Sequence, residues 1–78
     1  MKVKLEKVSD VKTFVETTRR FKSDIDLGSG KYLVDAKSIM GLFSLNFSKP
    51  MKVLFVPKDN ETEDDLKTAL MDAGFAVV

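Results

Sequence analysis

Residues 36–47 read Ala36-Lys37-Ser38-Ile39-Met40-Gly41-Leu42-Phe43-Ser44-Leu45-Asn46-Phe47. Ser38 directly precedes the apolar residues, in the position of a helix N-cap, so the sequence predicts a short helix starting there. A short amphipathic helix buries only one stripe of side chains. The stretch contains more large apolar residues than one stripe can hold, and we expect some of them to face solvent or a partner.

The composition is that of a small globular protein. The chain has 78 residues, of which 44% are hydrophobic and 32% are charged. A chain of this length buries only somewhat more than about 60% of its unfolded surface, so it has room for one shared core. We therefore expect a single domain over residues 1–78, and no internal repeat or low-complexity segment interrupts it.

Charge and residue usage exclude several functions. The formal net charge is +1, too small for the basic footprint of a nucleic-acid-binding protein. Cysteine and histidine are both absent, which removes thiolate ligands and the commonest general base and metal ligand. We expect no cofactor and no metal site. The N-terminus alternates charged and aliphatic residues instead of forming a signal peptide, and no later stretch is apolar enough to span a membrane, so a cytoplasmic protein is expected.

Periodicity and turn residues predict an α+β protein. Strands are expected at Lys2–Val8, Asp24–Leu27, Lys31–Val34 and Met51–Val56, and helices at Asp10–Phe21, from Ser38, and from Thr62 to Gly74. The glycines in Gly28-Ser29-Gly30 fit a hairpin turn better than a phosphate loop, because no helix follows them. The acidic cluster Glu63–Asp65 fits the first turn of a helix, where the dipole favours carboxylates, better than a metal site.

This order of elements predicts an open-faced two-layer sandwich, in which a four-stranded, mainly antiparallel sheet is covered on one face by three helices. An apolar tail, residues 75–78, is expected to pack back on the domain or onto a partner. The inward-facing set should include Val3, Leu5, Phe14, Val15, Ile25, Leu27, Val34, Val53, Phe55, Leu66 and Leu70.

The segment 36–45 resembles the region around the regulatory serine of HPr, the histidine-containing phosphocarrier protein of the bacterial sugar phosphotransferase system. The element order and chain length are also similar, and Phe14-Val15 falls where the family's first helix carries a similar pair. Aligned without gaps, the family's phosphorylated histidine falls at Lys7, and its following arginine and proline fall at Ser9 and Asp10. A protonated lysine cannot replace the imidazole in a phosphoryl relay, so the phosphocarrier activity is not expected.

The resemblance implies a regulatory role instead. In the family, the residue matching Ser38 is phosphorylated by a bifunctional HPr kinase/phosphorylase, and the phosphoprotein is a corepressor with a LacI-type regulator in carbon catabolite repression. An HPr-like paralogue of catabolite repression keeps this serine and lacks the histidine, as does this chain. The candidate regulatory site is therefore Ser38. The candidate docking residues are Ile39, Met40 and Phe43 beside it and Lys12, Glu16 and Arg19 on the first helix.

Two alternatives remain beside this non-enzymatic regulatory protein. One is an HPr-like interaction or oligomerisation module, for example a homodimer, in which Ser38 is only an N-cap and the apolar cluster is only core. The other is an enzyme that uses Lys7, Ser9 and Asp10 in acyl transfer. The enzyme is the weakest reading because nothing indicates an oxyanion hole, and such residues are common capping sequence.

Overall fold

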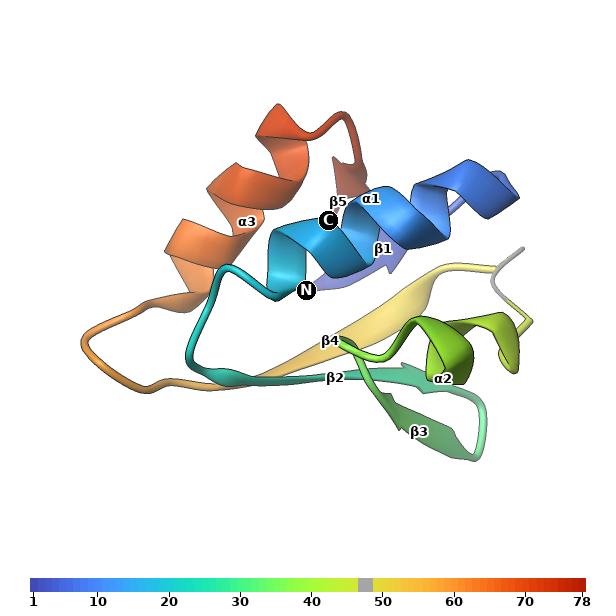
Figure 1. Ribbon diagram of the computed structural model, residues 1–78, viewed down its shortest axis with the longest axis horizontal. Helices are drawn as coiled ribbons and strands as arrows, with labels where there is room; N and C mark the ends of the chain where they lie inside the picture. Colours follow the sequence, from blue (N-terminus) through green and yellow to red (C-terminus); the bar gives the residue numbers. More distant parts are fainter. Residues whose placement is uncertain (47–48) are drawn as a thin grey trace.

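The computed structural model describes residues 1–46 and 49–78. The elements follow one another along the chain as shown in Figure 1: β1 (Lys2–Lys4), α1 (Val8–Thr18), β2 (Asp24–Ser29), β3 (Tyr32–Asp35), α2 (Ile39–Phe43), β4 (Met51–Val56), α3 (Glu63–Asp72) and β5 (Ala76–Val77). The predicted connection from Asn46 to Pro50 contains residues 47 and 48, which lie outside the described residues.

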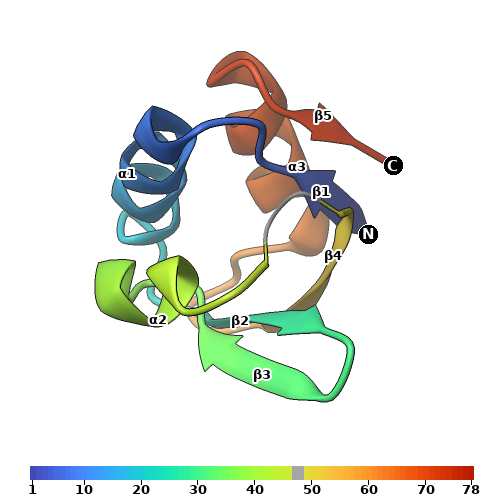
Figure 2. The same ribbon diagram turned by 90° about the vertical axis from the view of Figure 1, so that its right-hand side faces the viewer.

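The sheet has the order β3-β2-β4-β1-β5, and every pair of neighbouring strands is antiparallel. All three helices lie on one of its faces (Figure 2). The predicted α+β two-layer sandwich is therefore confirmed, with five strands instead of four. The additional strand is the apolar tail, which packs back on the domain: Phe75 is buried, and Ala76 and Val77 pair with Lys4 and Val3 of β1.

The N-terminal end of α1 differs from the prediction. The helix begins at Val8 with Lys7 as its N-cap residue, and it ends at Thr18 instead of Phe21. Asp10, predicted as the first residue of this helix, is its third residue, and its Oδ2 accepts hydrogen bonds from the backbone N–H groups of Glu6 and Lys7 at 2.9 and 3.2 Å. A carboxylate reaching back from this position satisfies donors that a helix start leaves free. β1 accordingly ends at Lys4 and not at Val8.

The other predicted caps and the hairpin are present, but the hairpin turn is shifted, because Gly28 and Ser29, predicted as turn residues with Gly30, are the last residues of β2. Ser29 and Tyr32 are cross-strand partners, so Gly30 and Lys31 form a two-residue hairpin loop, and Gly30 has a positive φ of 59°. Thr62 caps α3 by accepting a hydrogen bond from Asp65 N at 3.1 Å, while Asp65 Oδ2 accepts one from Thr62 N at 2.9 Å. Gly74, with a φ of 98°, follows the end of α3.

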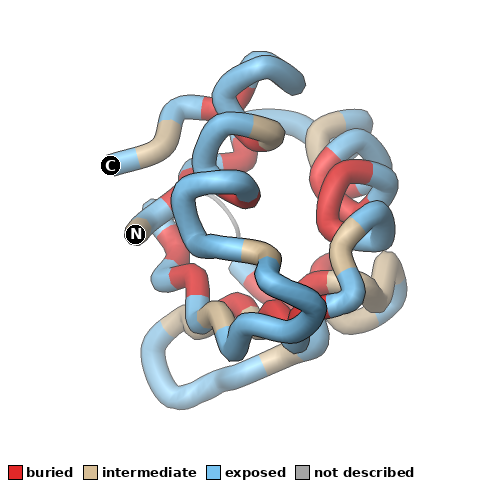
Figure 3. The backbone as a smooth tube through the Cα atoms, turned by 90° about the vertical axis from the view of Figure 1, so that its left-hand side faces the viewer, coloured by how far each residue is buried: buried red, intermediate tan, exposed pale blue. Residues whose placement is uncertain are grey.

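The core lies between the helices and the sheet (Figure 3). Nine of the eleven residues predicted to face inward are buried. Val34 and Phe55 are only half-buried, although both pack against the core, and Val34 lies on the edge strand β3 where no further strand covers it. Among the residues that the structure describes, the other buried hydrophobic side chains are Val11, Ala36, Leu42, Leu45, Met51 and Phe75.

No helix among the described residues is long and apolar enough to cross a membrane. Within residues 1–46 and 49–78, no group of three or more acidic side chains is placed to hold a metal ion, and the sequence has neither histidine nor cysteine. The cluster Glu63–Asp65 forms the first turn of α3, where the helix dipole favours negative charge.

Candidate functional site

Ser38 is the N-cap residue of α2. Its backbone is extended, with φ of −105° and ψ of 110°, and its Oγ accepts a hydrogen bond from the backbone N–H of Gly41 at 3.1 Å. A Cβ atom added at position 41 would lie 3.4 Å from this Oγ and 3.4 Å from Val34 Cβ. Glycine at position 41 therefore leaves the surroundings of the half-buried Ser38 hydroxyl uncrowded.

The apolar residues of α2 divide between core and solvent. Leu42 is fully buried, and Ile39 is partly buried and packs against the core. Met40 and Phe43 point outward, with 77% and 47% of their surface exposed. Because one short helix cannot bury its whole circumference, these two side chains form an apolar surface directly beyond Ser38.

One flank of α1 lies beside α2, as both ribbon views show (Figures 1 and 2). The exposed residues Lys12, Glu16 and Arg19 follow one another at helical spacing, so they lie along one face of α1 and its C-cap. Arg19 Nε donates a hydrogen bond to the backbone carbonyl of Lys37 at 3.1 Å, which joins the end of α1 to the residue before Ser38. The structure thus brings Arg19 close to the Ser38 cap.

Two further hydrogen bonds hold the segment that leads into Ser38. Thr18 Oγ1 donates to the carbonyl of Ala36 at 2.8 Å, and Lys37 Nζ donates to the carbonyl of Phe21 at 2.6 Å. Sequence reasoning did not assign Thr18, Lys37 or Gly41 to the site. A buried threonine in a helix and a lysine just before an N-cap carry no pattern of their own, because their partners are backbone carbonyls 16 to 18 residues away.

Lys7 lies elsewhere. It caps the beginning of α1, whereas Ser38 lies beside the end of that helix (Figure 1). Next to Lys7 is a polar cavity of about 230 Å³, lined by Lys4, Glu6, Lys7, Asp10 and residues 73–76. The side chain of Asp10 is held at the helix start by Glu6 and Lys7 N–H groups, so the three residues proposed for an acyl-transfer enzyme are arranged as a helix cap.

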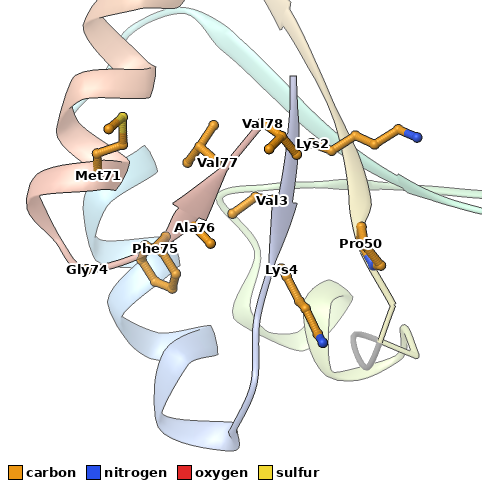
Figure 4. Close-up of a pocket in the computed structure, with 10 residues that line it drawn as sticks. All are labelled: Lys2, Val3, Lys4, Pro50, Met71, Gly74, Phe75, Ala76, Val77 and Val78. Atoms are coloured by element: carbon orange, nitrogen blue, oxygen red, sulfur yellow. The ribbon is translucent and has the colours of Figure 1, made fainter.

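A larger cavity of about 620 Å³ lies at the β1–β5 edge (Figure 4). Its lining is mainly apolar, from Val3, Met71, Phe75 and the last three residues of the chain, and the ammonium groups of Lys2 and Lys4 point away from Met71 and Phe75. It contains no carboxyl or hydroxyl side chain and lies apart from Ser38, so it adds no chemical group to the candidate site.

Comparison with known proteins assigns this arrangement to a family. The family described as "PTS HPr component phosphorylation site" matches residues 10–73, a span that includes Ser38 and excludes Lys7. The chain belongs to the HPr family. Every element from α1 to α3 lies wholly or largely within the matched span.

Among solved structures, this HPr-family chain is similar to Crh, the catabolite repression protein of Bacillus subtilis. The TM-score is 0.62 and the sequence identity 29%, over 94% of this chain and 78% of Crh. Crh was described as a swapped, intertwined dimer. No curated protein sequence matches the chain.

Proposed function

We propose that this HPr-family protein is a regulatory module whose Ser38 accepts a phosphate, and that it has no phosphocarrier activity. The observation that carries the proposal is the pairing of two facts about the chain. Ser38 lies within the family-matched span and presents its hydroxyl at the start of α2, while the 78 residues contain no histidine. The resemblance to Crh, a catabolite repression protein, agrees with this role.

The absence of histidine argues against phosphoryl relay. Lys7, at the position of the family's phosphohistidine, is exposed and is the N-cap residue of α1. An ammonium group has no free lone pair for attack on a phosphoryl donor at neutral pH. In this proposal the protein is a non-enzymatic component of the cytoplasm and acts by binding other proteins.

A phosphate on Ser38 would suit the local structure. It adds about −1.5 to −2 charge at pH 7 and further acceptor oxygens. The bridging oxygen is the same Oγ that now accepts from Gly41 N, so the cap can persist. The change at the surface is mainly a new charge between the exposed Met40 and Phe43 on one side and Arg19 on the other. A partner protein can recognise this charge without a conformational change in the HPr-family domain.

Phosphorylation is tested by incubating the protein with purified HPr kinase/phosphorylase and ATP and measuring its intact mass. We expect the addition of one phosphate. Ser38→Ala should abolish it, whereas Ser44→Ala, at the opposite end of α2, should leave it unchanged. A Ser38→Ala protein that still gains the phosphate would contradict the assignment.

The proposed partner is a LacI-type regulator that recognises the phosphorylated form. The recognised surface is formed by Met40, Phe43, Lys12, Glu16 and Arg19, and the partly buried Ile39 packs beneath it against the core. We expect Met40→Lys to weaken binding of the phosphorylated protein to the purified regulator. Met71→Lys is the matched control, because Met71 is also an exposed methionine but lies on α3. Equal binding by both variants would argue against this surface.

A second candidate is an interaction module that needs no phosphate. It is favoured by the exposure of Met40 and Phe43 in the unmodified chain. In that case binding of the purified partner would be lost on Met40→Lys and unaffected by Ser38→Asp. The first proposal requires the opposite response to Ser38→Asp, namely tighter binding than the unmodified protein shows.

A further inference from the structure

The face of the sheet that is turned away from the helices carries an unusual separation of charge. Because side chains alternate along a strand, the residues directly before and after the buried Val3 and Val53 point to this outer face. Figure 4 shows Val3 on one side of β1 and Lys2 and Lys4 on the other. The outer-face lysines are Lys2, Lys4 and Lys52, on β1 and β4, and the outer-face aspartates are Asp24, Asp26 and Asp35, on β2 and β3.

Within each group, like charges are direct neighbours. Lys2 is the cross-strand partner of Lys52, and Asp26 is the cross-strand partner of Asp35. Like charges opposite one another destabilise a sheet. In the described part of the chain, no carboxylate lies within salt-bridge distance of the three lysines, and of the three outer-face aspartates only Asp24 has an ion pair, with Lys58 at 3.3 Å.

Apolar side chains occupy the remainder of this face. Leu33 and Val56 each expose 58% of their surface and Leu54 exposes 37%. Leu54 pairs with Asp26 across β2 and β4, and Leu33 pairs with Gly28. None of the described helices covers the face, since all three pack on the opposite side (Figure 2). The face therefore has an apolar strip next to a basic group at one corner and an acidic group at the other.

We propose that this outer sheet face binds a second copy of the same chain, face to face. The two copies are related by a two-fold axis that lies between the sheets and parallel to them, and that runs between the basic and the acidic group. This rotation places the lysines of each copy over the aspartates of the other copy. The same rotation brings the two apolar strips together. Each like-charged pair then meets the opposite charge, so the feature that costs stability in one chain stabilises the pair.

Charge complementarity favours a second copy over another kind of partner. An acidic partner would leave Asp26 and Asp35 repelled, and a basic partner would leave Lys2 and Lys52 repelled. A surface that carries both halves of the pattern needs a partner that carries both halves in reverse order, and rotation of the chain itself supplies one.

The test is a charge exchange between two variants of the full chain. K2E/K52E reverses two of the three lysines and makes the face mainly acidic, and D24K/D26K reverses two of the three aspartates and makes it mainly basic. All four positions lie on strands, and in the described part of the chain their side chains make no hydrogen bond to a buried residue. Sedimentation equilibrium should show that the unaltered protein dimerises with concentration. Each variant alone should lose at least tenfold in affinity, and an equimolar mixture should recover a one-to-one complex. About 1 M salt should weaken it, because screening then acts beyond about 3 Å.

Controls separate the surface from charge in general. K12E/K67E and D64K/D72K carry the same changes in charge on the helices and leave the outer face intact, so each should dimerise as strongly as the unaltered protein. As a measurement free of substitutions, amide chemical shifts of the unaltered protein should move with concentration in β2, β4 and β1. A protein that is monomeric at every concentration overturns the proposal, as does a loss of affinity in the helix variants as large as that in K2E/K52E and D24K/D26K. A dimer unaffected by salt and by K2E/K52E, as expected for exchange of a strand between copies, overturns it too.

Discussion

The hydroxyl of Ser23 donates a 2.6 Å hydrogen bond to Oε1 of Glu61, which lies 38 residues further along the chain. The same carboxylate accepts from Ser23 N at 2.8 Å and from Lys22 N at 3.1 Å. Ser23 lies between α1 and β2, and Glu61 lies between β4 and α3. The Glu61 side chain therefore joins these two connecting segments. The hydrogen bond from Ser23, followed by those from the two backbone N–H groups, lowers the pKa of Glu61 from its usual value near 4.5.

This carboxylate makes stability depend on pH. A group whose pKa is lower in the folded state contributes stability that is present above its unfolded pKa and is lost as the pH falls through the folded value. We expect Glu61→Gln to be less stable than the unaltered protein at about pH 6. The difference should shrink below pH 4.5, because protonation then removes the same interaction from the unaltered protein.

Urea unfolding midpoints, measured across this pH range by circular dichroism, give the comparison. Asp64→Asn is the matched control. Asp64 is the second residue of α3, and among the described residues its exposed carboxylate forms no hydrogen bond or ion pair with another segment. If the stability difference between Glu61→Gln and the unaltered protein stays constant from pH 6 to below 4.5, ionisation of Glu61 does not stabilise the folded state.

The α3 cap should be measurable by itself. Thr62→Ala removes the acceptor for Asp65 N and should destabilise the protein by about 1 kcal/mol. Thr68→Ala, in the exposed middle of the same helix, removes no cap and should be neutral or slightly stabilising, because alanine has the higher helix propensity. Urea unfolding of both variants measures the two changes in stability. Equal changes would show that the Thr62 cap does not stabilise the protein.

Ser38 should contribute to stability whether or not it is phosphorylated. Ser38→Ala removes the acceptor for Gly41 N and should cost about 1 kcal/mol, while Ser38→Asp keeps a capping oxygen and should be within a few tenths of the unaltered protein. Thermal unfolding measures both. A Ser38→Asp protein as unstable as Ser38→Ala would show that the structure does not tolerate an anion at this cap.

The rings of Phe14 and Phe75 meet edge to face, with centroids 5.7 Å apart and planes at 82°. This contact joins α1 to the segment that leads into β5. Leucine at both positions in a double-mutant cycle should reveal a coupling of about 0.5–1.5 kcal/mol beyond the loss of buried area. A second cycle, combining Phe75→Leu with Lys31→Ala at the opposite edge of the sheet, should be additive.

The sequence predicted the parts of the fold that depend on local chemistry. Ser38 and Thr62 are N-caps as expected, since a hydroxyl followed by an apolar periodic run is a local signal. Lys7 was not predicted as the N-cap of α1 because lysine is not a preferred N-cap residue, and Asp10, three residues further along, accepts the hydrogen bonds at this helix start. β5 was missed as a strand because two apolar residues carry no alternation, and only pairing with β1 defines it.

The candidate site was predictable in composition more than in arrangement. The excess of apolar residues in α2 predicts some exposure, but only the packing of the helix selects Met40 and Phe43 as the exposed pair and places Ile39 against the core. The ties from Arg19 and Thr18 to the segment before Ser38 end on backbone carbonyls, and a backbone acceptor has no residue-specific signal in a sequence.

Lys2, the first residue of β1, and Val78, which follows β5, exchange backbone hydrogen bonds of 2.7 and 3.0 Å, so they are neighbours. The chain is therefore suited to circular permutation, with a short linker from Val78 to Met1 and new ends opened at the Gly30–Lys31 turn. In such a permuted protein, β1 would be an internal strand, joined to other parts of the chain at both of its ends. This strand could then be studied in a protein in which it cannot separate from its own sheet by fraying from a chain terminus.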